Sequence, residues 1–143
     1  MKEKNTGELF SEIQQTEEIH SYLKDNKKSL HYPTIAEFLN KVLQDKGMTK
    51  KELIEESNLD RVYVYQILSG VKTAPSRAKL LSLAIALKLS LDETQHLLKY
   101  GKVPELYPRD STDSVIIYAI KQQLSLHDTN ELLNELGLKC LSQ

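Results

Sequence analysis

The sequence has little of several features that define common classes of protein. It contains one cysteine, Cys140, in 143 residues, which excludes an intrachain disulfide and fits a reducing cytoplasm. The longest apolar run, VIIYAI at 115–120, is far shorter than the roughly 20 residues that span a bilayer. The opening stretch MKEKNTGELFSEI lacks the apolar region of a signal peptide. We therefore expect a cytoplasmic protein that does not enter a membrane.

Helix-breaking residues are also scarce, with four prolines and five glycines in the whole chain. Between them the apolar residues recur at helical spacing, and strand-like alternation is confined to RVYVYQI at 61–67. The pattern predicts an all-α protein. The length allows one domain with an appendage. We place an N-terminal helical arm at 1–33, a central domain at 34–100, and a linker with a C-terminal αα-hairpin packed on that domain at 101–143.

Positive charge is concentrated in one segment. The chain as a whole has a net charge of −1. Residues 46–79 hold seven Lys/Arg against four Asp/Glu, a net of +3, whereas residues 1–45 and 80–143 each hold six against eight, a net of −2. Phosphate contact depends on the local field rather than on the total charge. The central segment is therefore the candidate for contact with nucleic acid.

Two capping boxes mark the starts of helices in this region. Thr34 is followed three residues later by Glu37, and Thr49 by Glu52. The first box opens an amphipathic helix that Gly47 ends, because glycine adopts the left-handed conformation at a helix C-terminus. The second box opens a short helix, which places a tight connection near residues 58–60.

The segment that follows this connection is ambiguous by propensity alone. RVYVYQI is rich in good strand formers, but Asp60 can cap a helix there, and no partner strand exists. Asn58 tolerates the left-handed turn that must precede it. We predict a helix over 61–68 whose core face is Val64, Ile67 and Leu68. Its opposite face is suited to base edges and consists of Arg61, Val62, Tyr65, Gln66 and Ser69.

The C-terminal half contains an internal repeat. LSLDETQHLL at 89–98 matches LSLHDTNELL at 124–133 with an offset of 35 residues, and Ala84-Ile85 matches Ala119-Ile120. Both copies read as helix, serine-capped turn, helix, so they predict two αα-hairpins in tandem. Such hairpins either extend the core of the central domain or form a surface for dimerisation or a partner.

The N-terminal arm offers fewer signals. Residues 6–30 suggest two short helices or one kinked helix, with Thr16, Glu17 and Glu18 as a start for the second. The arm either covers the core or serves as a dimerisation element, and the sequence leaves both open.

Residues Thr49–Ser76 resemble the helix-turn-helix of the lambda-repressor-like (Xre-type) family. The resemblance covers about residues 35–94, and the stretch LYPRDSTDSVIIYAI is similar to helical extensions of uncharacterised bacterial regulators. The residues that carry the resemblance to the lambda-repressor-like domain are Thr49, Glu52-Leu53, Leu59, Tyr63-Val64, Ile67, Gly70, Pro75-Ser76 and the run LLSLAIALKLSLDE. The resemblance implies a five-helix DNA-binding domain whose third helix lies in the major groove.

The same resemblance implies roles for individual residues. Asp60 departs from the family pattern because it sets a negative charge close to the DNA. The residues that match base-reading positions are Arg61, Val62, Tyr65 and Gln66. Those that match positions contacting the DNA backbone are Lys50, Tyr63, Ser69, Lys72 and Thr73, with Arg77 as a further phosphate contact.

Features of other site classes are lacking. The four histidines, His20, His31, His96 and His127, show no metal-ligand spacing with one another or with Cys140. No P-loop, dinucleotide fingerprint or nucleophile elbow occurs. We therefore expect no metal, no cofactor and no enzymatic activity.

Two functional hypotheses follow. The first is a transcriptional regulator, most simply a repressor, that binds double-stranded DNA as a homodimer on operators with half-sites about 34 Å apart. The second is a protein-interaction module that keeps the helix-turn-helix scaffold without binding DNA and meets its partner through the arm or the C-terminal hairpins. The acidic flanks and Asp60 favour the second, and the positive central segment favours the first.

Overall fold

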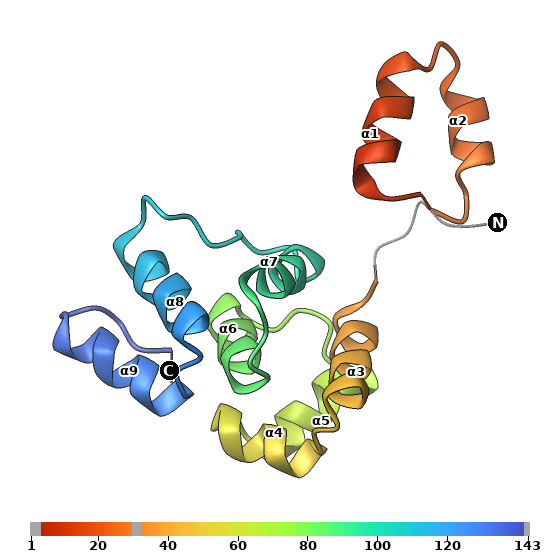
Figure 1. The fold of residues 1–143 in the computed structure, drawn as a ribbon. Coiled ribbons are helices and arrows are strands. Elements are labelled where there is room, and N and C mark those ends of the chain that lie inside the picture. The colour runs from red at the N-terminus through yellow and green to blue at the C-terminus, as the bar shows by residue number, and fades with distance from the viewer. Residues whose placement is uncertain (1–3, 30–32, 142–143) are drawn as a thin grey trace. The chain divides into compact units, whose positions relative to one another are not determined.

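The computed structural model describes residues 4–29 and 33–141, and every regular element within them is an α-helix (Figure 1). The all-α prediction is therefore confirmed. The chain divides into two compact units, Met1–Tyr32 and Pro33–Gln143. The helices are α1 (Thr6–Gln15), α2 (Ile19–Asp25), α3 (Ile35–Lys46), α4 (Lys50–Ser57), α5 (Arg61–Ser69), α6 (Arg77–Ala86), α7 (Leu91–Tyr100), α8 (Ser111–Gln122) and α9 (Leu126–Glu135).

The N-terminal unit is a pair of short helices, α1 and α2. The start of α2 differs from the expected one, because the Glu18 carboxylate rather than Thr16 caps the helix and accepts the backbone N–H groups of His20 and Ser21. The Ser21 hydroxyl donates a further hydrogen bond to the same carboxylate. This hydroxyl first, and then the hydrogen bonds from His20 and the Ser21 N–H, lower the pKa of Glu18 to about 2. A carboxylate at a helix N-terminus is also favoured by the helix dipole.

Polar contacts tie the two helices of this unit together. Glu12 of α1 pairs with Lys4 and accepts a 2.8 Å hydrogen bond from Asn26 Nδ2, which follows α2. The Lys4 ammonium, followed by Asn26, holds the pKa of Glu12 below its ordinary value. Apolar burial is slight by comparison, since Tyr22 is the only buried hydrophobic side chain among residues 4–29.

The second unit opens with the two helices whose capping boxes the sequence shows. Thr34 and Thr49 each accept the N–H of the glutamate three residues on, and each glutamate reaches back to the cap. Gly47 ends α3 at φ 64° and Asn58 ends α4 at φ 55°, both left-handed. These predicted starts and stops are confirmed.

The helix α5 forms despite its strand-forming composition. The Asp60 carboxylate accepts the Tyr63 N–H at 3.2 Å, and Gly70 closes the helix at φ 85°. Asn40 of α3 donates a 2.8 Å hydrogen bond to the carbonyl of Leu68, so the last turn is held from outside. Caps and packing therefore override propensity here. The buried face is the predicted one, namely Val64, Ile67 and Leu68.

The helix α6 is the centre of the second unit. It contacts α4, α7 and α9 and lies between the helix-turn-helix and the last two helices (Figure 1). Its residues from Leu80 to Ala86 are all buried. The C-terminal hairpin of α8 and α9 adds Ile116, Ile120, Leu126 and Leu133 to the same core. Among the described residues, no helix is both long and apolar enough to cross a membrane.

An ion pair fastens the C-terminal hairpin to α6. The guanidinium of Arg77 meets the carboxylate of Asp113 in a two-pronged contact, with N–O distances of 3.1 and 2.8 Å. The same guanidinium donates to the carbonyls of Pro104 and Glu105 in the linker. The Asp113 carboxylate also accepts the N–H of Tyr107. One partly buried ion pair thus joins α6, the linker and α8.

Candidate nucleic-acid interface

The outward face of α5 gathers the four predicted base-reading residues. Together with Ser69 they line one shallow hollow of about 460 Å³. Val62 is 61% exposed and Tyr65 39% exposed. Arginine and glutamine side chains match the donor and acceptor patterns of base edges, and an apolar side chain suits a thymine methyl group. The residues of the hollow are Arg61, Val62, Tyr65, Gln66 and Ser69.

Tyr65 brings two cations together on this face. The Lys50 Nζ lies 5.4 Å from the centroid of the Tyr65 ring, and the Arg61 Cζ lies 5.6 Å from it. Contacts of this kind contribute about 0.5–1 kcal/mol at exposed sites. The first residue of α4 is therefore placed beside the first residue of α5, although eleven positions separate them in the chain.

A second cationic group surrounds Tyr63. The Nζ atoms of Lys79 and Lys72 lie 4.1 and 5.4 Å from the Tyr63 ring centroid. These side chains line a cleft of about 370 Å³ between the helix-turn-helix and α6, whose lining is mixed and includes Ser57, Ser82 and Leu141. Burial raises the pKa of the Tyr63 hydroxyl, so the group stays protonated at neutral pH and can donate to an anion.

Lys79 was missed by the sequence analysis. It lies on the first turn of α6, where its N–H donates to the Ser76 cap. By itself it reads as an ordinary exposed lysine, and only the approach of α6 to α5 sets it over Tyr63. The signal that could have found it is its place two residues after Arg77, at the end of the only positive segment.

The loop after α5 is held by the last turn of that helix. The Lys72 N–H donates to the carbonyl of Gln66 at 3.0 Å, and the Ser69 hydroxyl donates to the same carbonyl at 3.2 Å. Lys72, Thr73 and Ser69 are exposed. The predicted backbone-contacting residues of this loop are thus presented to solvent on an ordered segment.

Within the part of the chain that the structure describes, Asp60 is the one acidic residue in the lining of the cleft that Lys72 and Lys79 share. Its carboxylate is engaged as the cap of α5 through the Tyr63 N–H. The cap accounts for an acid at this position, and two ammonium groups outnumber it within the cleft.

Arg77 is placed differently from its predicted role. Its donors meet Asp113 and the two linker carbonyls, and its side chain is only 29% exposed. A guanidinium in this arrangement is committed to the fold and has little freedom to reach a phosphate. We therefore assign Arg77 to holding the C-terminal hairpin and leave it out of the interface.

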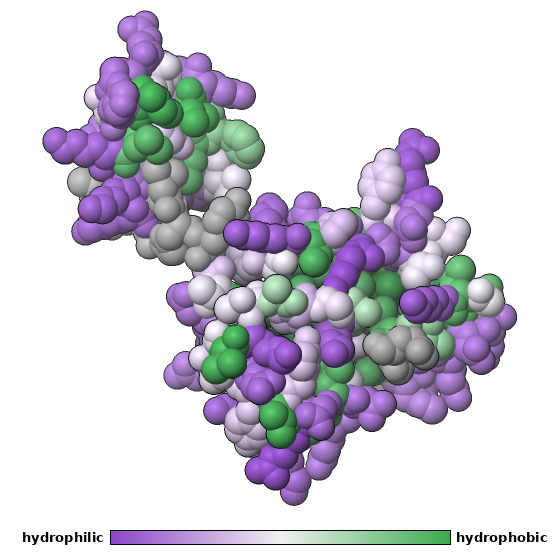
Figure 2. Space-filling view, turned by 180° about the vertical axis from the view of Figure 1, so that it is seen from behind, coloured by the Kyte–Doolittle hydropathy of each residue, from purple (hydrophilic) through white to green (hydrophobic). Residues whose placement is uncertain are grey.

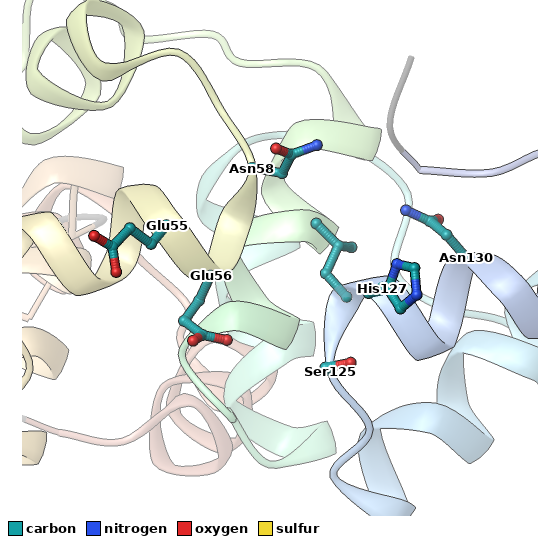
Figure 3. A pocket seen from close by; sticks show the side chains of 7 residues that line it. Glu55, Glu56, Asn58, Ser125, His127 and Asn130 are labelled. Carbon is teal, nitrogen blue, oxygen red and sulfur yellow. The ribbon is translucent and has the colours of Figure 1, made fainter.

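A third hollow, of about 400 Å³, lies where the end of α4 faces the start of α9 (Figure 3). Glu55 and Glu56 line it from α4, with the Glu55 carboxylate directed away from α9, and Ser125, His127 and Asn130 line it from the other side. Two carboxylates make this an unsuitable place for a phosphate.

His127 also lies beside two carboxylates, those of Asp128 and Glu131, which the sequence analysis did not consider as metal ligands. Its ligand atom and those of Asp128 and Glu131 lie within 4.8 Å of one another. All three side chains are exposed, and the imidazole Nε2 already lies 3.3 Å from the Glu131 carboxylate. Exposed groups of this kind are common without a metal, so we assign no metal to them. His31 lies outside the described residues.

Comparison with known proteins identifies the central region. The family model described as Helix-turn-helix matches residues 39–94. No curated protein and no solved structure matches the chain. The matched segment runs from within α3 into the first turn of α7, so it contains α4, α5 and α6 entire.

Proposed function

We propose that this protein regulates transcription by binding double-stranded DNA at specific sequences through the helix-turn-helix region that the family model matches at residues 39–94, which resembles the lambda-repressor-like (Xre-type) family. The observation that carries the proposal is the single hollow on α5 that Arg61, Val62, Tyr65 and Gln66 share. In the proposed complex α5 lies in the major groove. Repression is the simplest outcome, because a bound protein blocks access to the DNA that it covers.

Base reading follows from the chemistry of the α5 face. Arg61 pairs with the O6 and N7 acceptors of guanine, and Gln66 with the N6 and N7 of adenine. Val62 contacts a thymine methyl group beside them. Each good bidentate pair discriminates by about 1–3 kcal/mol against the wrong base. Tyr65 holds Arg61 in place through the ring contact.

Backbone contacts flank this face on both sides. Lys50 meets phosphate on the side of α4, and Ser69, Lys72 and Thr73 meet it on the side of the loop. The Tyr63 cleft adds Lys79 to the predicted set, because its ammonium faces the same ring as that of Lys72. Such contacts position the protein and carry no sequence information.

A homodimer fits this mode of binding. Helix-turn-helix dimers place two recognition helices about 34 Å apart on successive turns of the duplex, which matches a pseudo-palindromic operator. A single α5 offers four base-reading side chains, so a second copy is needed for a site long enough to be rare.

The test is selection of binding sites from a random duplex library, followed by titration of the selected duplex with variants. We expect Arg61→Ala to lose preference for the selected site over random duplex, by about 10- to 100-fold. Lys72→Ala should weaken binding to both duplexes alike and lower the salt slope by about 1. Lys121→Ala, an exposed lysine on α8, is the matched control and should bind as the wild type does.

The rival hypothesis predicts a different result. An interaction module without DNA binding would enrich no sequence and would show weak duplex affinity with no salt slope. That outcome, or an Arg61→Ala protein with unchanged preference, contradicts the proposal.

A further inference from the structure

The N-terminal unit exposes most of its apolar side chains. Helix α1 has no buried residue at all. Figure 2 shows apolar side chains gathered on one face of this unit, between charged ones. The exposed fractions are 64% for Phe10, 43% for Ile13, 47% for Ile19 and 50% for Leu23. An apolar cluster of this kind on so small a surface marks an interaction site.

The unit is too small to be stable alone. Its helices have 10 and 7 residues, whereas isolated helices below about 12–15 residues are marginal in water. Domains below about 40 residues usually need a metal, disulfides or oligomerisation. The chain cannot form an intrachain disulfide, and no metal-ligand group is found among residues 4–29. Association with a second copy would stabilise it, and the exposed apolar side chains provide a surface for that association.

The charges of the unit indicate which partner fits. Residues 4–18, which contain α1, hold four glutamates against one lysine. Residues 19–29, which contain α2, hold three lysines against one aspartate. A two-fold interface is self-complementary, because each element of one copy faces the other element of its partner. The acidic segment 4–18 and the basic segment 19–29, whose lysines gather at and just after the end of α2, therefore attract across such an axis when α1 faces the α2 of the second copy.

We propose that the N-terminal unit is the homodimerisation element of this protein. Two copies pair about a two-fold axis and form a four-helix cluster. Its core is made of Phe10, Ile13, Ile19 and Leu23 from each copy. This inference extends beyond DNA binding, which the second unit provides through α5.

The experiment measures the mass of the full-length chain in solution by sedimentation equilibrium from 1 to 100 µM. We expect the wild type to sediment at twice the chain mass of 16.4 kDa. The double variant Phe10→Glu/Leu23→Glu should sediment as a monomer, with the dimer dissociation constant raised at least 100-fold. Leu136→Glu is the matched control, because Leu136 is 57% exposed but lies in the second unit. It should remain a dimer.

A second variant keeps the test sharp if the first affects folding. Lys24→Glu/Lys27→Glu leaves every apolar side chain in place and makes both helices acidic. We expect the dimer dissociation constant to rise about 10-fold, and Lys121→Glu/Lys139→Glu in the second unit should leave it unchanged. Circular dichroism of each variant checks that the helical content is retained.

Several results would overturn the proposal. They are a wild-type monomer at 100 µM, a dimer that survives both N-terminal double variants, and an assembly other than a dimer. A dimer that survives both N-terminal double variants would contradict this inference and leave the proposed contacts of α5 with DNA intact, whereas a wild-type monomer would also contradict the homodimer of the proposed function. Loss of duplex binding with a normal dimer would contradict only the proposed function.

Discussion

The two tandem hairpins, α6–α7 and α8–α9, have the same local structure and different surroundings. Lys88 and Gln123, 35 residues apart, both have φ 55°. In each copy the next leucine donates its N–H to an alanine carbonyl, Leu89 to Ala84 at 3.1 Å and Leu124 to Ala119 at 3.0 Å. The repeat seen in the sequence is therefore a repeat of backbone conformation as well.

The likeness continues beyond the matched residues. Gln95 of α7 accepts the N–H of Leu106, and Asn130 of α9 accepts the N–H of Leu141, again 35 positions on. Both leucines are buried. Each hairpin thus folds its own trailing segment back onto itself, by one side-chain contact that recurs with the same offset.

The difference lies in what covers each copy. Gly101 of the first hairpin packs so closely that an added Cβ would lie 2.5 Å from Leu80 Cδ1 and 3.4 Å from Ile35 Cδ1. The equivalent residue of the second hairpin, Leu136, is 57% exposed. Helix α3 packs against the first hairpin and joins it to the helix-turn-helix region. No described element covers the same position of the second.

The largest predicted effect concerns the ion pair of Arg77 with Asp113, which joins the second hairpin to the first. Asp113→Ala removes the buried partner of Arg77 and leaves its charge without compensation, so the free energy of unfolding should fall by on the order of 3 kcal/mol. Chemical denaturation measures this. Asp92→Ala is the control, because that carboxylate is 90% exposed, and it should change stability by less than about 1 kcal/mol. Equal losses for both variants would refute the bracing role of Arg77.

An intermediate effect tests the covering by α3. Gly101→Ala forces the new methyl group against Leu80, which is fully buried, and overpacking of this kind costs about 1–3 kcal/mol. The backbone itself accepts alanine, since Gly101 has φ −78°. Leu136→Ala at the equivalent position should cost less than about 0.5 kcal/mol. Thermal unfolding of the two variants measures both changes in stability. A Gly101→Ala variant as stable as the wild type would contradict the close packing at this position.

The smallest effect concerns the shared turn. A non-glycine residue in the left-handed region costs about 1–2 kcal/mol, and glycine recovers part of it at an entropic cost of about 0.5–1 kcal/mol. Gln123→Gly should therefore stabilise the protein by up to about 1 kcal/mol. Lys88→Gly should gain less, because it removes the 2.8 Å hydrogen bond from Lys88 Nζ to the Gln123 carbonyl. Differential scanning calorimetry measures the unfolding temperature of both variants. A higher unfolding temperature for Lys88→Gly than for Gln123→Gly would contradict this ranking.

Prediction from the sequence succeeded where the physical cause is local. Thr34 and Thr49 with their glutamates form the expected capping boxes, because a cap and its partner are three residues apart on any helix. The face of α5 followed from the spacing of Val64, Ile67 and Leu68. Once that face is buried, the four base-reading candidates must share the opposite one.

The sequence did not reveal contacts between residues that are distant in the chain. Arg77 was expected at phosphate, and the structure pairs it with Asp113, 36 residues away in α8. Lys79 was overlooked because the ring it covers belongs to another helix. The error at Thr16 is a local one, since Glu18 was recognised as favourable at a helix start but not as the cap itself.

The sequence by itself determined the helices, the turn residues and the duplicated hairpin, since each depends on contacts within about five positions of the chain. Only the tertiary structure decided which cationic side chains lie at the candidate interface and which pair within the fold. Arg77 and Lys79 stand two residues apart on α6, yet one is clamped by Asp113 and the other lies over Tyr63. The physical reason is that a long cationic side chain pairs with whatever carboxylate or ring the packing of helices brings within reach.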